Sequence, residues 1–101
     1  MQQMKFFIDT HDVDSGTYPA GLTPEQFETF FAKYEAACYE EGVIPLRVHI
    51  AYADNRAFCF TMAPDSAAVR RAHIKAGLPY SSITEVTTAT PGDTFFRRTA
   101  I

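Results

Sequence analysis

Two helix patterns separated by strand-like segments are the feature that most restricts the fold of this chain. One helix pattern follows Thr23 and the other follows Asp65, and each ends at a glycine, Gly42 or Gly77. Segments rich in β-branched and aromatic residues precede and follow each helix pattern. The order strand–helix–strand–strand–helix–strand is that of the ferredoxin-like split βαβ motif. We therefore predict an α+β sandwich, βαββαβ, whose four-stranded antiparallel sheet carries two helices on one face.

The first helix has the more complete start signal. Thr23 is a favourable N-cap residue, Pro24 suits the first helical position, and Gln26 completes a capping box. Leu22 and Phe27 have the spacing of a hydrophobic staple around that cap. We predict strands over residues 4–10, 43–53, 56–62 and 83–88.

Length and composition fit one domain. The chain has 101 residues, which we assign to a single domain, 1–101, with 90–101 as a C-terminal tail. A net charge of −3 argues against nucleic acid and anionic membrane surfaces as partners. No apolar run approaches the roughly 20 residues that span a bilayer, and the N-terminus lacks a signal-peptide pattern. Cys38 and Cys59 do not make a disulfide framework, so we expect a cytoplasmic protein.

Strand alternation sorts the side chains of the sheet into two faces. The more apolar set, which we expect to face the helices, is Phe6, Ile8, Leu46, Val48, Ile50, Phe58, Phe60 and Val86. The opposite set is Lys5, Phe7, Asp9, Arg47, His49, Ala51, Ala57, Cys59, Thr61, Glu85 and Thr87. Its mixed character suits a face covered by a second subunit, which predicts a dimeric α/β barrel.

This second face collects residues that could bind a metal or a small molecule. His49, Cys59, Asp9 and Glu85 share it by parity, and imidazole, thiolate and carboxylate suit Zn, Ni or Cu. Cys59 and His49 could also form a thiolate–imidazolium pair across the hairpin. The alternative is structural, with His49 a half-buried sheet residue and Cys59 a small hydrophobe.

The other two histidines lie elsewhere in the predicted fold. His11 opens a long polar loop that also contains Asp12 and Asp14. The loop lacks the full ligand set of a calcium loop. The structural alternative to a ligand role is a solvated turn. His73 falls at the edge of the apolar stripe of the second helix, near its C-terminus. A favourable contact with the helix dipole would explain it there without a ligand role.

Several fragments of the chain resemble a small bacterial nickel-binding-protein family. They are residues 60–65, 68–70, 73–79 and 83–86, with residues 19–23 and 40–43 in addition. The resemblance implies a ferredoxin-like fold, a homodimer and a capacity to bind Ni²⁺. His73, in the pattern H-x-x-x-G-x-P, is the best-matched candidate ligand. His11, His49 and Glu85 are further candidates by their chemistry alone.

Three functional hypotheses follow. The first is a dimeric, non-enzymatic protein that binds nickel through imidazole and carboxylate groups. The second is a small-molecule-binding protein or enzyme of the dimeric α/β-barrel type, with a pocket on the second sheet face lined by Phe7, Asp9, His49, Cys59 and Glu85. The third is an interaction module that docks through Phe95 and Phe96 of the tail.

Overall fold

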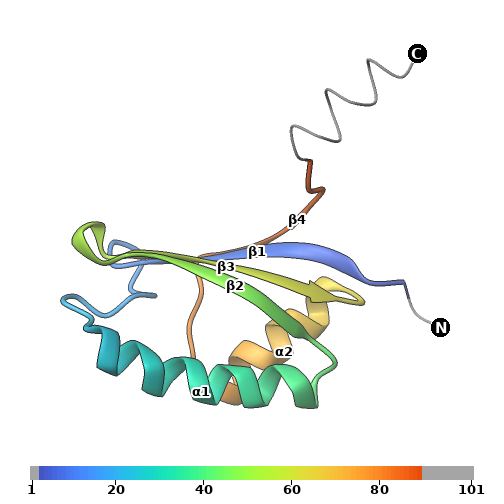
Figure 1. Ribbon diagram of the computed structural model, residues 1–101, viewed down its shortest axis with the longest axis horizontal. Coiled ribbons are helices and arrows are strands. Elements are labelled where there is room, and N and C mark those ends of the chain that lie inside the picture. The colour runs from blue at the N-terminus through green and yellow to red at the C-terminus, as the bar shows by residue number, and fades with distance from the viewer. Residues whose placement is uncertain (1–2, 90–101) are drawn as a thin grey trace.

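The computed structural model describes residues 3–89 and has the predicted order of elements (Figure 1). The strands are β1 (Lys5–Asp12), β2 (Ile44–Ala51), β3 (Arg56–Ala63) and β4 (Ser82–Val86). The helices are α1 (Pro24–Glu40) and α2 (Ser66–Ala76), with a short 3-10 helix η1 (Tyr52–Asp54) between β2 and β3. The tail that carries Phe95 and Phe96 lies outside the described residues.

Both helices begin where the sequence signals place them. The Thr23 side chain accepts a hydrogen bond from the Gln26 backbone, and the Gln26 side chain accepts one from the Thr23 backbone, which completes the capping box. The Asp65 side chain caps α2 by accepting from the Ala68 backbone N–H. Gly77 ends α2 in the left-handed conformation that glycine adopts without strain.

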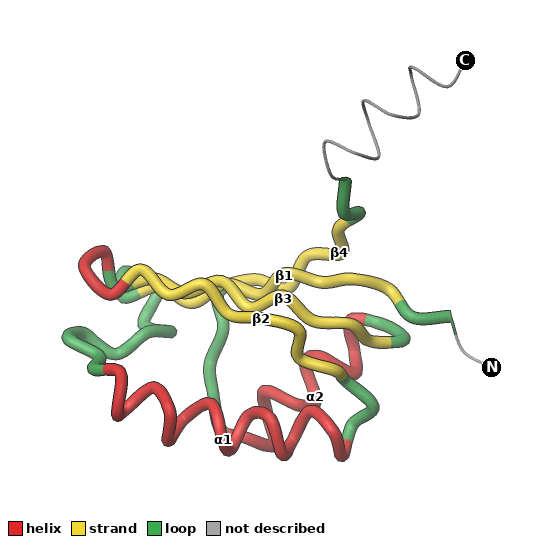
Figure 2. The backbone as a smooth tube through the Cα atoms, in the orientation of Figure 1, coloured by secondary structure: helices red, strands yellow, loops and turns green. Residues whose placement is uncertain are grey.

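The four strands form one antiparallel sheet in the order β2-β3-β1-β4. Both helices lie against the same face of this sheet, and the opposite face carries no described helix (Figure 2). Pro45 is tolerated because β2 is an edge strand, and the register of β2 shifts between Pro45 and Arg47. The predicted α+β, ferredoxin-like arrangement is therefore confirmed.

The faces of β1 and β3 are the reverse of our prediction. Phe7, Asp9, Cys59 and Thr61 point to the helices and are buried. Phe7 is the largest fully buried side chain among the described residues, and the helices approach it closely because most of their own buried residues are small. The core cluster consists of Phe7, Tyr34, Cys38, Val43, Ala63, Ala68, Val69 and Ala72. Alternation separated the two sets correctly but did not show which set the helices cover.

The larger apolar side chains lie on the face without helices, which we call the open face. By strand register it carries Phe6, Ile8, Phe58, Phe60, Met62 and Val86, all half-buried. The rings of Phe6 and Phe60 stack with centroids 5.5 Å apart. On β2 the prediction holds in part: Val48 and Ile50 face the helices, whereas Leu46 is exposed.

Two acidic residues at the C-terminal end of α1 are balanced by basic residues of α2. Arg71 Nε lies 2.9 Å from Glu41 Oε1, and Lys75 Nζ lies 2.9 Å from both Glu40 and Glu41. Carboxylates at this end of a helix oppose its dipole. The cations of the neighbouring helix offset that repulsion and tie the ends of the two helices together.

Candidate metal centre

Asp9, His11 and His73 converge at the interface between the sheet and α2. His11 Nε2 lies 2.8 Å from Asp9 Oδ2, and His73 Nε2 lies 2.9 Å from the same oxygen. One ligand atom from each residue lies within 4.8 Å of the other two, the only such group among residues 3–89. The strand β1 therefore supplies two potential ligands and α2 supplies the third.

His11 belongs to β1 and not to the loop in which we predicted it. The strand continues through His11 because His11 pairs with Ala57 and Asp12 with Arg56. Since Asp9 and His11 are two residues apart on one strand, both side chains point to the helix-covered face. Asp12 is the last residue of β1, and Asp14 lies in the turn that follows. Asp12 Oδ1 accepts a hydrogen bond from the Asp14 backbone N–H, and the Asp12 carboxylate forms an ion pair with Arg56.

His73 is buried, with 1% of its surface exposed. A favourable contact with the helix dipole is therefore not its only interaction. The helix α2 turns it toward the sheet, where its ring contacts three other rings. The centroid of Tyr34 lies 4.7 Å away, that of Tyr80 lies 5.1 Å away, and that of His11 lies 5.5 Å away. These contacts hold the imidazole in one orientation.

Backbone carbonyls determine which nitrogen of each histidine is available. His11 Nδ1 lies 2.8 Å from the Pro79 carbonyl oxygen, and His73 Nδ1 lies 2.9 Å from that of Val69. A carbonyl oxygen can only accept, so both Nδ1 atoms carry the hydrogen that is donated. In a neutral ring this leaves a lone pair on Nε2, and both Nε2 atoms point at Asp9. Metal-binding histidines are typically oriented by this kind of second contact.

Asp9 is fully buried and held in its ionised form. Burial raises the pKa of the carboxyl group, but the hydrogen bonds and positive charge that His11 and His73 provide when Nε2 carries a proton outweigh it and leave the pKa below the ordinary 3.8. The second oxygen, Oδ1, is buried and has no hydrogen-bond partner among the described residues. A buried carboxylate with an unpaired oxygen and two imidazoles beside it can still accept a further hydrogen bond or coordinate a metal ion.

The neighbouring thiols and phenol are neutral at physiological pH. Burial raises the pKa of the Cys38 thiol to about 11, and burial together with the Asp9 charge raises that of Cys59 well above 9.0. Burial also raises the pKa of Tyr34. Cys59 is therefore a poor nucleophile, and the thiolate–imidazolium pair with His49 does not form, because His49 is on the other face of the sheet, opposite Phe58.

The remaining predicted site residues do not join this group. His49 is exposed on β2, and Glu85 is exposed on the edge strand β4. Phe7, Asp9 and Cys59 share one face of the sheet as predicted, but the helices cover that face, and all three side chains are buried. The spacing Asp9-x-His11 within one strand was a visible signal for the true grouping. His73 could not be added to it without the position of α2.

The geometry agrees with what comparison with known proteins finds. Residues 7–86 match the family model described as nickel-responsive protein SCO4226-like. The chain belongs to the SCO4226-like family. This match contains all three residues of the candidate site.

The crystal structure of SCO4226 from Streptomyces coelicolor A3(2) is similar to the whole described fold. The two chains are 26% identical, with a TM-score of 0.73, over 84% of this chain and 99% of that chain. A search of curated proteins found no match. Within residues 3–89, neither helix has the length and apolar character needed to cross a membrane.

Proposed function

We propose that this protein binds a divalent transition-metal ion through Asp9, His11 and His73, and that nickel is the preferred ion. The observation that carries the proposal is the orientation of the two histidines. Each ring gives its Nδ1 hydrogen to a backbone carbonyl and directs Nε2 at one buried carboxylate. Two imidazoles and a carboxylate form a donor set that suits nickel, zinc, copper and iron. The family description as nickel-responsive favours nickel among these.

The charge balance of the cluster supports a bound cation. With neutral rings and an ionised Asp9, two nitrogen lone pairs would face a carboxylate oxygen at 2.8 and 2.9 Å with no hydrogen between them. That arrangement is repulsive, so positive charge has to enter, either as protons on Nε2 or as a metal ion. The site is therefore expected to exchange protons for metal.

We further propose that the protein is a homodimer joined through the open face of the sheet. The half-buried aromatic and aliphatic residues of this face have no described helix over them. Contiguous apolar surface of this kind marks interaction sites on soluble proteins. Two such sheets packed face to face would place their metal sites on the outer, helix-covered sides.

The direct test is a calorimetric titration of the tag-free, EDTA-treated protein with Ni²⁺, with Zn²⁺ and Co²⁺ for comparison. We expect saturation at one ion per chain. His11→Ala should weaken Ni²⁺ binding by about tenfold or more, because it removes a ligand at the edge of the core without emptying the core. The matched control is His49→Ala, which removes an exposed histidine on the open face of the sheet and should leave the affinity for Ni²⁺ unchanged.

Proton exchange gives an independent readout in the same experiment. Titrations in buffers of different ionisation enthalpy should show that Ni²⁺ binding releases protons, and the affinity should fall as the pH is lowered. Absence of saturable binding, or an equal loss in the His11 and His49 variants, would remove this site from consideration.

A further inference from the structure

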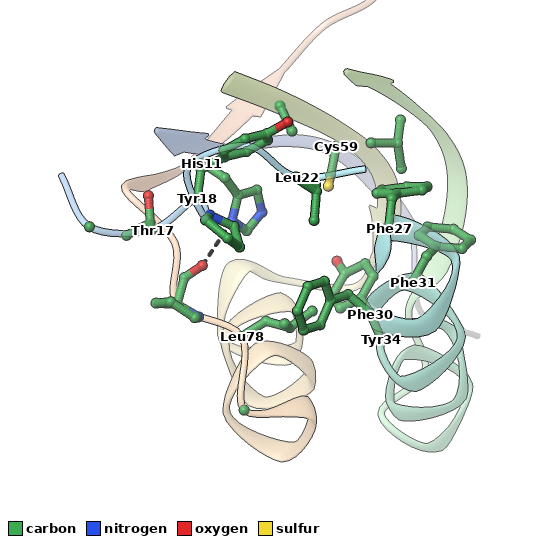
Figure 3. Close-up of a pocket in the computed structure, with 16 residues that line it drawn as sticks. His11, Thr17, Tyr18, Leu22, Phe27, Phe30, Phe31, Tyr34, Cys59 and Leu78 are labelled. Atoms are coloured by element: carbon green, nitrogen blue, oxygen red, sulfur yellow. Dashed lines mark hydrogen bonds between the residues drawn. The ribbon is translucent and has the colours of Figure 1, made fainter. Parts of the chain in front are cut away.

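A cavity lies between α1 and the helix-covered face of the sheet, beside the candidate metal centre. Its volume is about 300 Å³. Aromatic side chains of α1 form one wall, Val48 and Cys59 of the sheet form the opposite wall, and the segments around Tyr18 and Leu78 close the ends (Figure 3). The cavity is open to solvent on one side, and mostly apolar concave pockets of about 300–1,000 Å³ are the usual form of small-molecule sites. The cavity is therefore a feature that requires an explanation.

The walls of the cavity are suited to a flat apolar molecule. Phe27, Phe30, Phe31 and Tyr34 present four rings from successive turns of one helix face. Phe27 and Phe31 stack with centroids 5.5 Å apart, so the aromatic wall is continuous. Phe30 is 37% exposed, which leaves a route between the cavity and solvent. Aromatic rings of a ligand would stack on such a wall.

Polar groups enter the cavity at few points, and Tyr34 is the most informative. Its side chain is 2% exposed, and its hydroxyl lies beside the Cys38 thiol, a weak partner, without a regular hydrogen bond to any other described residue. Figure 3 shows the phenol reaching from α1 toward the space below the sheet. A buried hydroxyl without a strong partner is destabilising unless something bound there completes its hydrogen bond. The other polar groups of the lining come from His11, Thr17 and Tyr18. His11 Nδ1 already donates to the Pro79 carbonyl, and the buried Tyr18 hydroxyl also has no hydrogen-bond partner among the described residues.

We propose that this cavity binds a neutral aromatic molecule of about two fused rings that carries one hydroxyl or carbonyl oxygen. The size follows from the volume, because an apolar cavity of about 150 Å³ holds one benzene ring. Neutrality follows from the apolar walls, which would not compensate a charge. The single oxygen is placed by the Tyr34 hydroxyl, which can donate to it or accept from it.

This site is separate from the proposed metal site, although His11 lies at the boundary between them. Occupation of the cavity needs no metal, because Tyr34 and the four-ring wall belong to the chain itself. The experiment is therefore done on EDTA-treated protein. A failure to bind the aromatic molecule would then leave the nickel proposal standing, and a failure to bind nickel would leave the cavity proposal standing.

The probe is 2-naphthol, with naphthalene as the analogue that lacks the oxygen, both measured by equilibrium dialysis against the full chain. We expect one molecule per chain and a preference of about fivefold for 2-naphthol, the contribution of one hydrogen bond. Tyr34→Phe should abolish this preference and leave naphthalene binding unchanged. The matched control is Tyr39→Phe, which removes an exposed hydroxyl from the same helix.

A second pair of variants tests the location. Val48→Phe should fill the cavity and weaken both compounds by tenfold or more, whereas Ile74→Phe adds a ring on the exposed side of α2 and should change nothing. Thermal melting of the Tyr34→Phe variant should show only a small shift in the Tm of the empty protein, because only the weak contact with the Cys38 thiol is lost. Absence of saturable binding, or binding insensitive to both Tyr34→Phe and Val48→Phe, would overturn the proposal.

Discussion

At the scale of single residues, Asp9 is the group on which the candidate metal centre depends most. It is the one carboxylate that both histidines contact, and it is fully buried. The sequence did identify Asp9, His11 and His73 as chemically notable residues. It did not group them, because the contact between β1 and α2 is a tertiary one for which the chain carries no local signal.

We predict that Asp9→Asn lowers the free energy of unfolding of the metal-free protein by about 2 kcal/mol at pH 7. Asn keeps the shape but loses the negative charge, so the hydrogen bonds from His11 and His73 are no longer charge-assisted. Urea unfolding followed by circular dichroism measures the difference. The exposed Asp54→Asn should change stability by less than about 0.5 kcal/mol.

The same substitution should change the dependence of stability on acid. The folded pKa of Asp9 lies below the unfolded value of 3.8, so the folded state binds fewer protons than the unfolded state in that range. The contribution of Asp9 is therefore complete above the unfolded pKa and is lost as the pH falls through the lower folded pKa. The gap between wild type and Asp9→Asn should narrow on acidification below about pH 4. A constant gap between pH 7 and pH 3 would show that the ionised carboxylate does not stabilise the fold.

At the scale of elements, the sequence correctly predicted those features that depend only on residues close together in the chain. The caps at Thr23 and Asp65 and the stop at Gly77 are short-range chemistry, and all three lie where predicted. The end of β1 was missed by two residues because its pairing with β3 is decided across the sheet. The faces of β1 and β3 were assigned the wrong way round for the same reason, since alternation alone is symmetric between the two sides of a sheet.

We predict that Thr23→Ala destabilises the protein by about 1 kcal/mol through loss of the capping box at the start of α1. Thr29 offers a matched control because it lies exposed within the same helix, and Thr29→Ala should cost less than half as much. Chemical denaturation at pH 7 compares the two variants. Equal effects of the two substitutions would show that the cap is not a determinant of stability in this helix.

At the scale of the whole molecule, apolar residues are distributed over both faces of the sheet, and this distribution is the basis of the proposed dimer. The core under the helices is built largely from small residues, whereas Phe6, Phe58 and Phe60 lie on the face that no described helix covers. The sequence analysis proposed a second subunit over the face that carries Phe7, Asp9 and Cys59, but the structure places the helices over that face and leaves the other one open. Self-association, as proposed above, would cover this face without any further component.

We predict that Phe60→Glu converts a dimer into a folded monomer. The substitution places a charge in the middle of the open face beside Phe6, where a dry interface would have to desolvate it. Because the Phe60 side chain points away from the core cluster, the variant should keep the circular dichroism spectrum of the wild type. Size-exclusion chromatography with light scattering measures the mass of each species.

The control for this experiment is Tyr39→Glu, which replaces an aromatic residue of similar size that is 61% exposed on α1. That variant should keep the mass of the wild type, because the helices lie on the side of the sheet away from the proposed interface (Figure 1). A monomeric wild type, or a Phe60→Glu variant that stays dimeric, would contradict the open-face interface. A Phe60→Glu monomer that still binds Ni²⁺ with one ion per chain would show that each metal site is complete within a single subunit, as the placement of Asp9, His11 and His73 within one chain requires.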